Sequence, residues 1–203
     1  MGVFQAEGPD ASLFLDSVCA NDISALEVGQ SLYTHFLDVD ANVIDDTLVY
    51  YRSKDKYLVV VNASNDAKDW AWLNAVRNGA VMVDKNRPWA RAFGCNTILR
   101  NLRDPKEGAD MRVDIALQGP KSRDILLALG VDPLTRKRIM ALKRTELTEA
   151  KVGDFDLVVS RTGYTGEKMA FELFVHPDRA VDLWNALLAA GEPLGLKAAG
   201  LGA

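Results

Sequence analysis

Two segments of the chain begin in the same way, with Gly-Pro, a charged residue and a small residue ahead of a run of apolar positions. The first begins at Gly8 and the second at Gly119. In both, apolar side chains then recur every three or four positions, which is the period of a helix with one buried face. The pattern therefore predicts a helix after each Gly-Pro pair and indicates that the chain consists of two matching halves.

Apolar runs predict the strands of the first half. Residues 32–37 and 43–50 are β-rich and are separated by the sequence DVDAN, which is typical of a hairpin turn. The run YLVVV at 57–61 is apolar at every position, so we expect a strand that is buried on both faces. A short strand over 81–83 is expected to close this half.

Each half is expected to end with a helix. The first, over 66–77, begins after a capping Asn65 and stops before Gly79, and the second begins near Pro177 and stops at Gly191. The inward-facing residues are expected to be Trp70, Leu73 and Val76 in the first helix, and Ala180, Val181, Trp184, Leu187 and Leu188 in the second.

Three strands are expected in the second half, over 113–117, 155–161 and 171–175. Both halves therefore have the order helix, strand pair and helix, and they extend over about 8–85 and 112–195. The expected fold class is α+β, with duplicated antiparallel sheet units and flanking helices.

Two stretches lie outside this repeat and are rich in basic residues. Residues 86–110 form an insertion with five basic residues and one short helix expected near 97–102, and residues 134–144 contain five basic residues. A solvated basic face is one interpretation of both stretches. A surface for an acidic partner or for a polyanionic ligand tail is the other.

The composition narrows the class of protein. A net charge of −4 and a pI near 5.2 argue against a general nucleic-acid binder, because neutralising phosphates requires a basic face. No apolar run reaches the roughly 18 residues of a membrane span, and the first residues lack the pattern of a signal peptide, so we expect a cytoplasmic protein with no membrane partner. The 2 Cys and 2 His lack metal-ligand spacing, so we expect no metal site and no designed thiol nucleophile.

The first candidate site is the acid pair Asp45 and Asp46, within a β-rich run. Alternation along a strand sends the two side chains to opposite faces, so only one of them can enter a given cavity. A carboxylate in such a cavity could stabilise a developing positive charge or orient an amine. The alternative is a pair of turn-adjacent acids that keep the surface soluble.

Three further candidates lie in or beside the predicted strands. The sequence TGYTGE at 162–167 surrounds Tyr164 with glycines, which suits presentation of its ring to a flat heteroaromatic ligand, or is an ordinary strand connection. Glu172 lies between aromatic residues and either faces solvent, which the strand alone favours, or accepts N–H donors in a polar pocket. Asn62 ends a buried strand, either as a cap for the next helix or as a ligand contact.

The order and spacing of these pieces resemble the folate-binding domain of the glycine cleavage T protein (aminomethyltransferase) family. The matching strings extend over nearly the whole chain and are FLDSVCANDIS, VIDDTLVYY, YLVVVNASNDAKDW, ALQGPKSRDIL, VSRTGYTGE, FELFV and GLGA. The resemblance implies a transferase that moves one-carbon units, as aminomethyl or methyl groups, to tetrahydrofolate in glycine cleavage. It also implies an acidic lipoyl carrier protein as partner.

The resemblance assigns roles to residues by their position. It implies that Asp45 is the catalytic acid beside the reacting folate nitrogen, that Glu172 holds the pterin ring, and that Tyr164 and Asn62 line the pocket. A buried carboxylate would stabilise the positive charge of a reacting amine. A second carboxylate would accept the N–H donors along one edge of the pterin.

The chain also departs from the family pattern, which indicates a diverged or truncated member. Ala41-Asn42 replaces a Gly-Gly pair, one extra residue separates Glu167 from Glu172, and we expect the family's C-terminal domain to be absent. A fragment of this kind is expected to be marginally stable, to associate and to lack measurable transferase activity. The alternatives are a non-catalytic folate-binding accessory protein, which the lack of Cys in 162–167 disfavours, and the tetrahydrofolate domain of an amine-oxidising enzyme.

Overall fold

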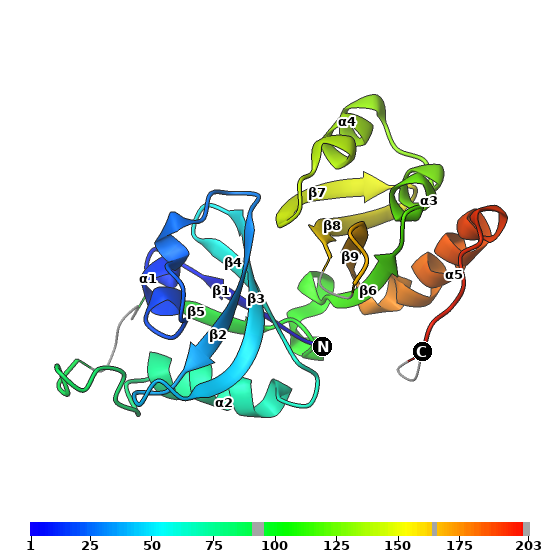
Figure 1. Ribbon diagram of the computed structural model, residues 1–203. Helices are drawn as coiled ribbons and strands as arrows, with labels where there is room; N and C mark the ends of the chain where they lie inside the picture. Colours follow the sequence, from blue (N-terminus) through cyan, green and yellow to red (C-terminus); the bar gives the residue numbers. More distant parts are fainter. Residues whose placement is uncertain (91–95, 164–165, 201–203) are drawn as a thin grey trace. The chain divides into compact units, whose positions relative to one another are not determined.

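The computed structural model describes residues 1–90, 96–163 and 166–200 of the chain. The chain forms two compact units, Met1–Gly108 and Ala109–Ala203 (Figure 1). Each unit has its own antiparallel sheet with flanking helices, so the α+β class expected from the sequence is confirmed.

A five-stranded sheet forms the frame of the first unit, in the order β2-β3-β4-β1-β5 with all neighbours antiparallel. Its strands are β1 (Gly2–Glu7), β2 (Ser31–Leu37), β3 (Val43–Ser53), β4 (Lys56–Val61) and β5 (Ile98–Asn101). Its helices are α1 (Ala11–Asp16) and α2 (Asp66–Arg77), with a 3-10 turn at Ile23–Ala25, and a further 3-10 segment, Pro105–Asp110, extends across the boundary to the second unit. The predicted hairpin, the third strand and the helix after Asn65 are confirmed, and β4 is buried along 57–61 as its apolar run predicts.

Both helices of the first unit pack on one face of its sheet. Phe4 and Ala6 of β1 alternate with the polar Gln5 and belong to the same buried cluster as Phe14 of α1 and Leu73 of α2. Burying one side chain of the size of Leu or Phe contributes about 1.5–3 kcal/mol. This shared cluster therefore fixes α1 and α2 against the sheet.

The second unit contains four strands in the order β6-β9-β8-β7, again antiparallel. Its elements are β6 (Val113–Gln118), α3 (Ser122–Ala128), α4 (Pro133–Ala141), β7 (Glu146–Val152), β8 (Phe155–Thr162), β9 (Ala170–Val175) and α5 (Ala180–Gly191), with 3-10 turns at Pro177–Arg179 and Glu192–Leu194. Written from the other edge, its order β7-β8-β9-β6 corresponds strand for strand to β2-β3-β4-β1. The two units therefore share one topology, to which the first adds β5.

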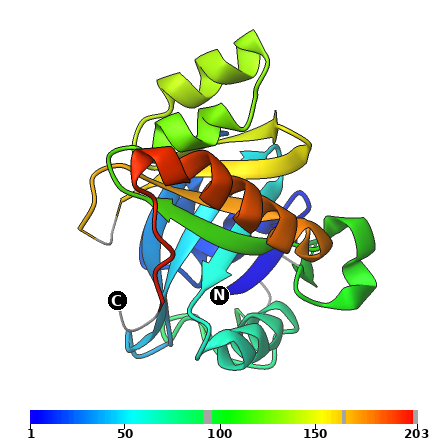
Figure 2. The ribbon, with the colours of Figure 1, turned by 90° about the vertical axis from the view of Figure 1, so that its right-hand side faces the viewer.

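Helix α5 buries a different face from the one that its apolar pattern predicts. Leu183 and Leu187 lie in the core cluster of the second unit, whereas Val181 is 69% and Trp184 is 39% exposed. Figure 2 shows α5 in front of β6, and Leu117 of β6 belongs to the same cluster as Leu183. The prediction is wrong for Val181 and Trp184, because the helix is apolar on most of its sides and packing rather than periodicity selects the buried stripe.

Two elements of the first unit differ from expectation. No strand forms over 81–83, and the helix expected near 97–102 is the edge strand β5. This strand pairs with β1, where Asn101 lies opposite Phe4 and Ile98 lies opposite Glu7. The hydrogen bonds come from a partner about ninety residues away in the sequence, so the local period could not identify the strand.

Helix α4 and strand β7 have no counterpart in the sequence analysis. Asp132 caps α4 by accepting hydrogen bonds from the backbone N–H groups of Leu134 (2.9 Å) and Thr135 (3.0 Å), and Pro133 occupies the first turn. An Asp-Pro pair of this kind is a signal for the start of a helix and could have identified α4. The basic stretch 134–144 is therefore mainly a capped helix.

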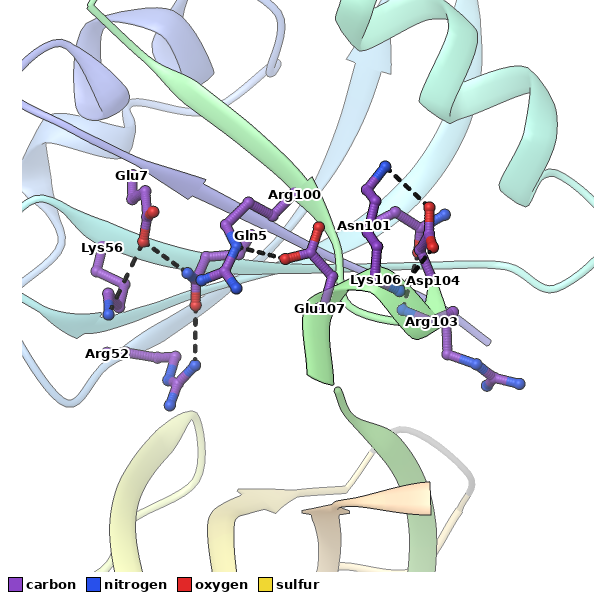
Figure 3. A network of polar contacts seen from close by, with 10 residues as sticks. All are labelled: Gln5, Glu7, Arg52, Lys56, Arg100, Asn101, Arg103, Asp104, Lys106 and Glu107. Carbon is purple, nitrogen blue, oxygen red and sulfur yellow. Dashed lines mark hydrogen bonds and ion pairs between the residues drawn. The ribbon is translucent and has the colours of Figure 1, made fainter. Parts of the chain in front are cut away.

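Basic residues of the 86–110 insertion have acidic partners within the first unit. Arg100 Nε lies 2.7 Å from Glu107 Oε2, and Lys106 Nζ lies 2.8 Å from Asp104 Oδ2 (Figure 3). The same figure shows the neighbouring contacts among Gln5, Glu7, Arg52 and Lys56. In the described part of the insertion these ion pairs favour an internally neutralised face over a surface for a polyanion.

Candidate functional site

Asp45 is the third residue of β3 and is 6% exposed, whereas the neighbouring Asp46 is half-buried. The burial along β3 alternates as the pattern predicts, but the two carboxylates are not kept apart, because the side-chain amide of Asn62 contacts both. A surface acid with a solubilising role would be exposed. The burial of Asp45 therefore contradicts that interpretation for this residue.

Three N–H donors hold the carboxylate of Asp45. The Nδ2 groups of Asn62 and Asn65 donate to its Oδ1 at 3.0 and 2.7 Å, and the backbone N–H of Asn62 donates to its Oδ2 at 3.4 Å. Asn62 follows β4 and Asn65 precedes α2, so the short β4–α2 turn supplies every one of these donors. The structure thus brings Asp45 and Asn62 into direct contact.

Asn62 also contacts Asp46. Its Nδ2 lies 2.9 Å from Asp46 Oδ1 and 3.3 Å from the Asp46 carbonyl oxygen. The hydroxyl of Tyr33 donates to Asp46 Oδ2 at 3.0 Å, and this hydrogen bond raises the pKa of Tyr33. One amide therefore joins the two acids, and the turn that carries it is tied to β3 at two consecutive residues.

The surroundings shift the pKa values of two neighbouring carboxyl groups in opposite directions. Asp69 of α2 is 0% exposed, and burial, together with the hydrogen bond to Asp45 and its negative charge, raises the pKa of Asp69 from 3.8 to about 7. Burial also acts to raise the pKa of Asp45, but the hydrogen bonds with Asp69, Asn62 and Asn65 outweigh it, so the pKa of Asp45 lies below its usual value. Asp45 is therefore the ionised member of the pair near neutral pH.

An ionised carboxylate in this position can stabilise a positive charge that develops beside it. The interaction is stronger in a buried setting than in water, because the effective dielectric constant is lower. The fixed donors also hold the carboxylate in place before any ligand arrives, so it does not have to reorganise during a reaction. Two carboxyl groups with separated pKa values are a common arrangement at sites that handle protons.

Glu172 lies in β9, on the face of the second sheet opposite to its apolar core. Phe171 and Leu173 belong to that core, so strand alternation turns Glu172 the other way. It is only 2% exposed, and the interpretation that it faces solvent is therefore wrong. Its cross-strand neighbour Ser160 is also buried, and among the described residues the hydroxyl of Ser160 has no hydrogen-bond partner. Such a hydroxyl beside a carboxylate suits a polar ligand.

The sequence analysis did not identify Asp69 or Ser160 and gave Asn65 a different role. Asn65 was expected to cap α2, but its side chain makes no cap hydrogen bond and instead donates to Asp45. The spacing of Asn65 and Asp69, four residues apart on a helix that follows Asn62, is the signal that could have found this cluster. Tyr164 lies outside the described residues, so its place beside a ligand stays a prediction.

Cys19 is a poor candidate for a nucleophile. Burial, and after it the nearby carboxylate of Asp16, raise the pKa of its thiol, which disfavours the reactive thiolate. Within the described ranges, no group of three or more His, Cys, Asp and Glu side chains is arranged to hold a metal ion. The described helices are all too short or too polar to cross a lipid bilayer.

Comparisons with known sequences match the entire chain. The family model for the GCVT N-terminal domain matches residues 1–203. The aminomethyltransferase of Halothermothrix orenii is 37% identical over 203 residues, and that of Bacillus pumilus is 37% identical over 204 residues. Both matches cover 100% of this chain but only 49% and 48% of the relative, so the chain spans about half the length of the curated relatives that it matches.

Two solved structures are also similar. The crystal structure of glycine cleavage system aminomethyltransferase T from Bartonella henselae matches with a TM-score of 0.70 and 28% identity, over 92% of this chain and 43% of that one. The heterotetrameric sarcosine oxidase from Corynebacterium sp. U-96, in complex with pyrrole 2-carboxylate, matches with a TM-score of 0.55 and 12% identity, over 98% of this chain and 83% of that one. At this low identity the second match shows a shared fold alone.

Proposed function

Because the chain belongs to the family of GCVT N-terminal domains, we propose that it is the folate-binding portion of a tetrahydrofolate-dependent aminomethyltransferase. In this proposal the whole protein is a cytoplasmic enzyme of one-carbon metabolism. It acts in glycine cleavage and takes its one-carbon unit from an acidic lipoyl carrier protein. The observation that carries the proposal is Asp45, a buried and ionised carboxylate held by three N–H donors at the position that the family resemblance assigns to the catalytic acid.

Asp45 supplies the negative charge that this reaction requires. A bound tetrahydrofolate provides the nitrogen that accepts the one-carbon unit, and positive charge develops on the reacting amine. The donors from Asn62 and Asn65 keep the carboxylate ionised and oriented toward one place. A single preorganised electrostatic contact of this kind contributes about 10²–10³ to turnover.

Glu172 and Ser160 suit the recognition of the pterin ring. The ring offers several N–H donors along one edge, and a carboxylate can accept two of them. The hydroxyl of Ser160, which has no partner within the described part of the chain, can donate to or accept from the same edge. Tyr164 completes the proposal as an aromatic face for the ring, and Asn62 lines the pocket beside Asp45.

A second candidate is the tetrahydrofolate domain of an amine-oxidising enzyme. The chain shares its fold with a sarcosine oxidase chain, but a likeness at 12% identity shows the fold alone. The identity of 37% to an aminomethyltransferase, against 12% to the oxidase chain, favours the first candidate. The third alternative, a folate-binding accessory protein with a functional Cys in the 162–167 loop, remains disfavoured because this loop has no Cys.

Calorimetry with tetrahydrofolate tests the proposed function, on this chain and on a longer protein that contains it. We expect saturable heat, and we expect Glu172→Gln to weaken the affinity because the pterin donors lose a charged acceptor. Asp156→Asn is the matched control, since Asp156 is an exposed acid of the neighbouring strand β8. The proposal is refuted if neither protein gives heat or a thermal shift with millimolar tetrahydrofolate.

A further inference from the structure

Helix α2 places a second carboxyl group directly behind the candidate catalytic acid. Asn65, Asp69 and Leu73 are spaced four residues apart and therefore share one face of the helix. Leu73 is buried in the core cluster and Asn65 donates to Asp45 at 2.7 Å, so Asp69 lies between the core and the site. Its side chain is 0% exposed.

The carboxyl group of Asp69 has no donor to support a negative charge. Among the described residues, no N–H or O–H group donates a hydrogen bond to either of its oxygens. The neighbouring cation, Lys68, directs its Nζ to the carbonyl oxygen of Ile44 at 2.6 Å. The other described charges that act on Asp69 are the carboxylates of Asp45 on β3 and Asp66 on α2, and both repel a negative charge. An ionised carboxylate without a donor is costly to bury, so these surroundings favour the protonated form.

A protonated carboxyl group carries one O–H donor, and that donor requires an acceptor. Asp45 is the neighbouring acceptor, because Asn65, one helical turn before Asp69, donates to the Asp45 carboxylate at 2.7 Å. We propose that Asp69 is a positioning residue, which holds a proton and donates it in a hydrogen bond to the carboxylate of Asp45. Asp45 then receives hydrogen bonds from three side chains and one backbone N–H, and only one proton is shared by the two acids.

This arrangement makes the charge of the site depend on pH near neutrality. When Asp69 keeps its proton, the pair carries one negative charge, held on Asp45. When Asp69 loses its proton, two carboxylates face each other without a donor between them, and the pair titrates as a unit. The inference rests on the proposed function only in treating Asp45 as the working carboxylate, because the shared proton itself is a property of the folded chain.

The test is a carbon-13 NMR titration of the ligand-free chain, with the side-chain carboxyl carbons of aspartate labelled. We expect one resonance with a midpoint near pH 7, far above the ordinary aspartate value of 3.8. Asp69→Asn should remove this resonance. Asp45→Asn should keep it but move its midpoint downward, toward but not to the ordinary value, because the repelling charge is lost while burial remains.

Asp66→Asn is the matched control, since it removes a neighbouring carboxylate of the same helix that contributes less than Asp45 to the raised pKa of Asp69, so it should lower the near-neutral midpoint less than Asp45→Asn does. The Asp45→Asn arm separates an acid whose pKa depends on Asp45 from one whose pKa is raised by burial alone and would not respond, and it carries the test if Asp69→Asn does not fold. The inference is overturned if every aspartate titrates in the ordinary range, if the near-neutral midpoint survives Asp69→Asn, or if Asp45→Asn leaves it unmoved. A failure to bind tetrahydrofolate would not alter this titration, so the two proposals fail separately.

Discussion

Replacing Asp69 with Asn should change how the stability of the chain depends on pH. Asn keeps the size of the side chain and offers an N–H donor to Asp45, but it cannot ionise. The variant therefore keeps a hydrogen-bond donor to Asp45 and removes only the titrating group at position 69. The relevant quantity is the difference in the free energy of unfolding between the variant and the wild type, measured at several pH values.

The magnitude follows from the two pKa values of Asp69. Burial, with the contribution of Asp45, raises the pKa in the folded chain to about 7, and the unfolded chain has the ordinary value of 3.8. Between these values the folded state holds a proton that the unfolded state has released, so stability falls as the pH rises. At about 1.36 kcal/mol for each pH unit, the wild type loses about 3 kcal/mol relative to the variant between about pH 4.5 and about pH 7.5.

Urea unfolding at each pH measures this difference. Trp70, Trp72 and Trp89 all belong to the first unit, so the fluorescence in a Trp184→Phe background reports on that unit. Glu27→Gln serves as the control, because Glu27 is an exposed acid of the same unit and its removal should leave the pH dependence unchanged. A difference between Asp69→Asn and wild type that stays constant across this range would refute the reasoning, since it would show that Asp69 titrates alike in the folded and unfolded states.

Three further predictions concern catalysis and folding. In the longer protein, Asp45→Asn should lower turnover by about 10²–10³ while changing folate affinity much less. Equal losses of turnover, measured by steady-state kinetics, and of affinity, measured by calorimetry, would show that Asp45 only binds the ligand. Gly119→Ala should lower the free energy of unfolding, measured in urea, by about 1–3 kcal/mol through backbone strain alone, because φ is +111° and an added Cβ would meet no atom within 4 Å. Gly8→Ala should lower the free energy of unfolding more than Gly119→Ala does, because an added Cβ would lie 2.1 Å from the carbonyl oxygen of Asn96. Equal losses of stability in the two variants would contradict this explanation. Leu73→Ala should lower the free energy of unfolding by about 2–5 kcal/mol. An unchanged melting temperature would show that α2 does not pack against the core.

Much of the fold follows from local patterns that the structure confirms. The run at 57–61 has no polar residue, and no position in it could face solvent without cost, so a doubly buried strand is its natural conformation. The turn before β3 carries its own signals, and the helix over 66–77 ends before Gly79 as its stop signal predicts, although Asn65 does not cap its start. Strand β5 could not be found in this way, because its stability depends on a pairing with β1 that no local sequence encodes.

Asp45, Asn62 and Glu172 were predicted from the sequence, whereas Asp69 and Ser160 were not. The acid pair drew attention because adjacent carboxylates in a β-rich run are unusual, the resemblance singled out Asp45, and the structure shows that Asp45 is buried. Asn65 was assigned to a helix cap, the commoner use of this residue type at that position, since the sequence does not show that a carboxylate lies within reach. The resemblance implied a pocket role for Glu172, and its burial agrees, whereas the strand pattern alone favoured solvent.

The shared topology of the two sheets also has a consequence for the order in which the chain can fold. In each unit the first strand pairs with the fourth, and about fifty residues lie between the two strands. Strand β1 therefore cannot form this pairing before β4 has been made, nor β6 before β9. Contacts so distant in sequence slow folding, because the loop between them has to close before the pairing stabilises it. During synthesis the first unit can complete its sheet once β5 has emerged, before any residue of β9 exists. The second unit then has no finished strand pair of its own until β8 follows β7, and its helix α5 is made only after all four of its strands.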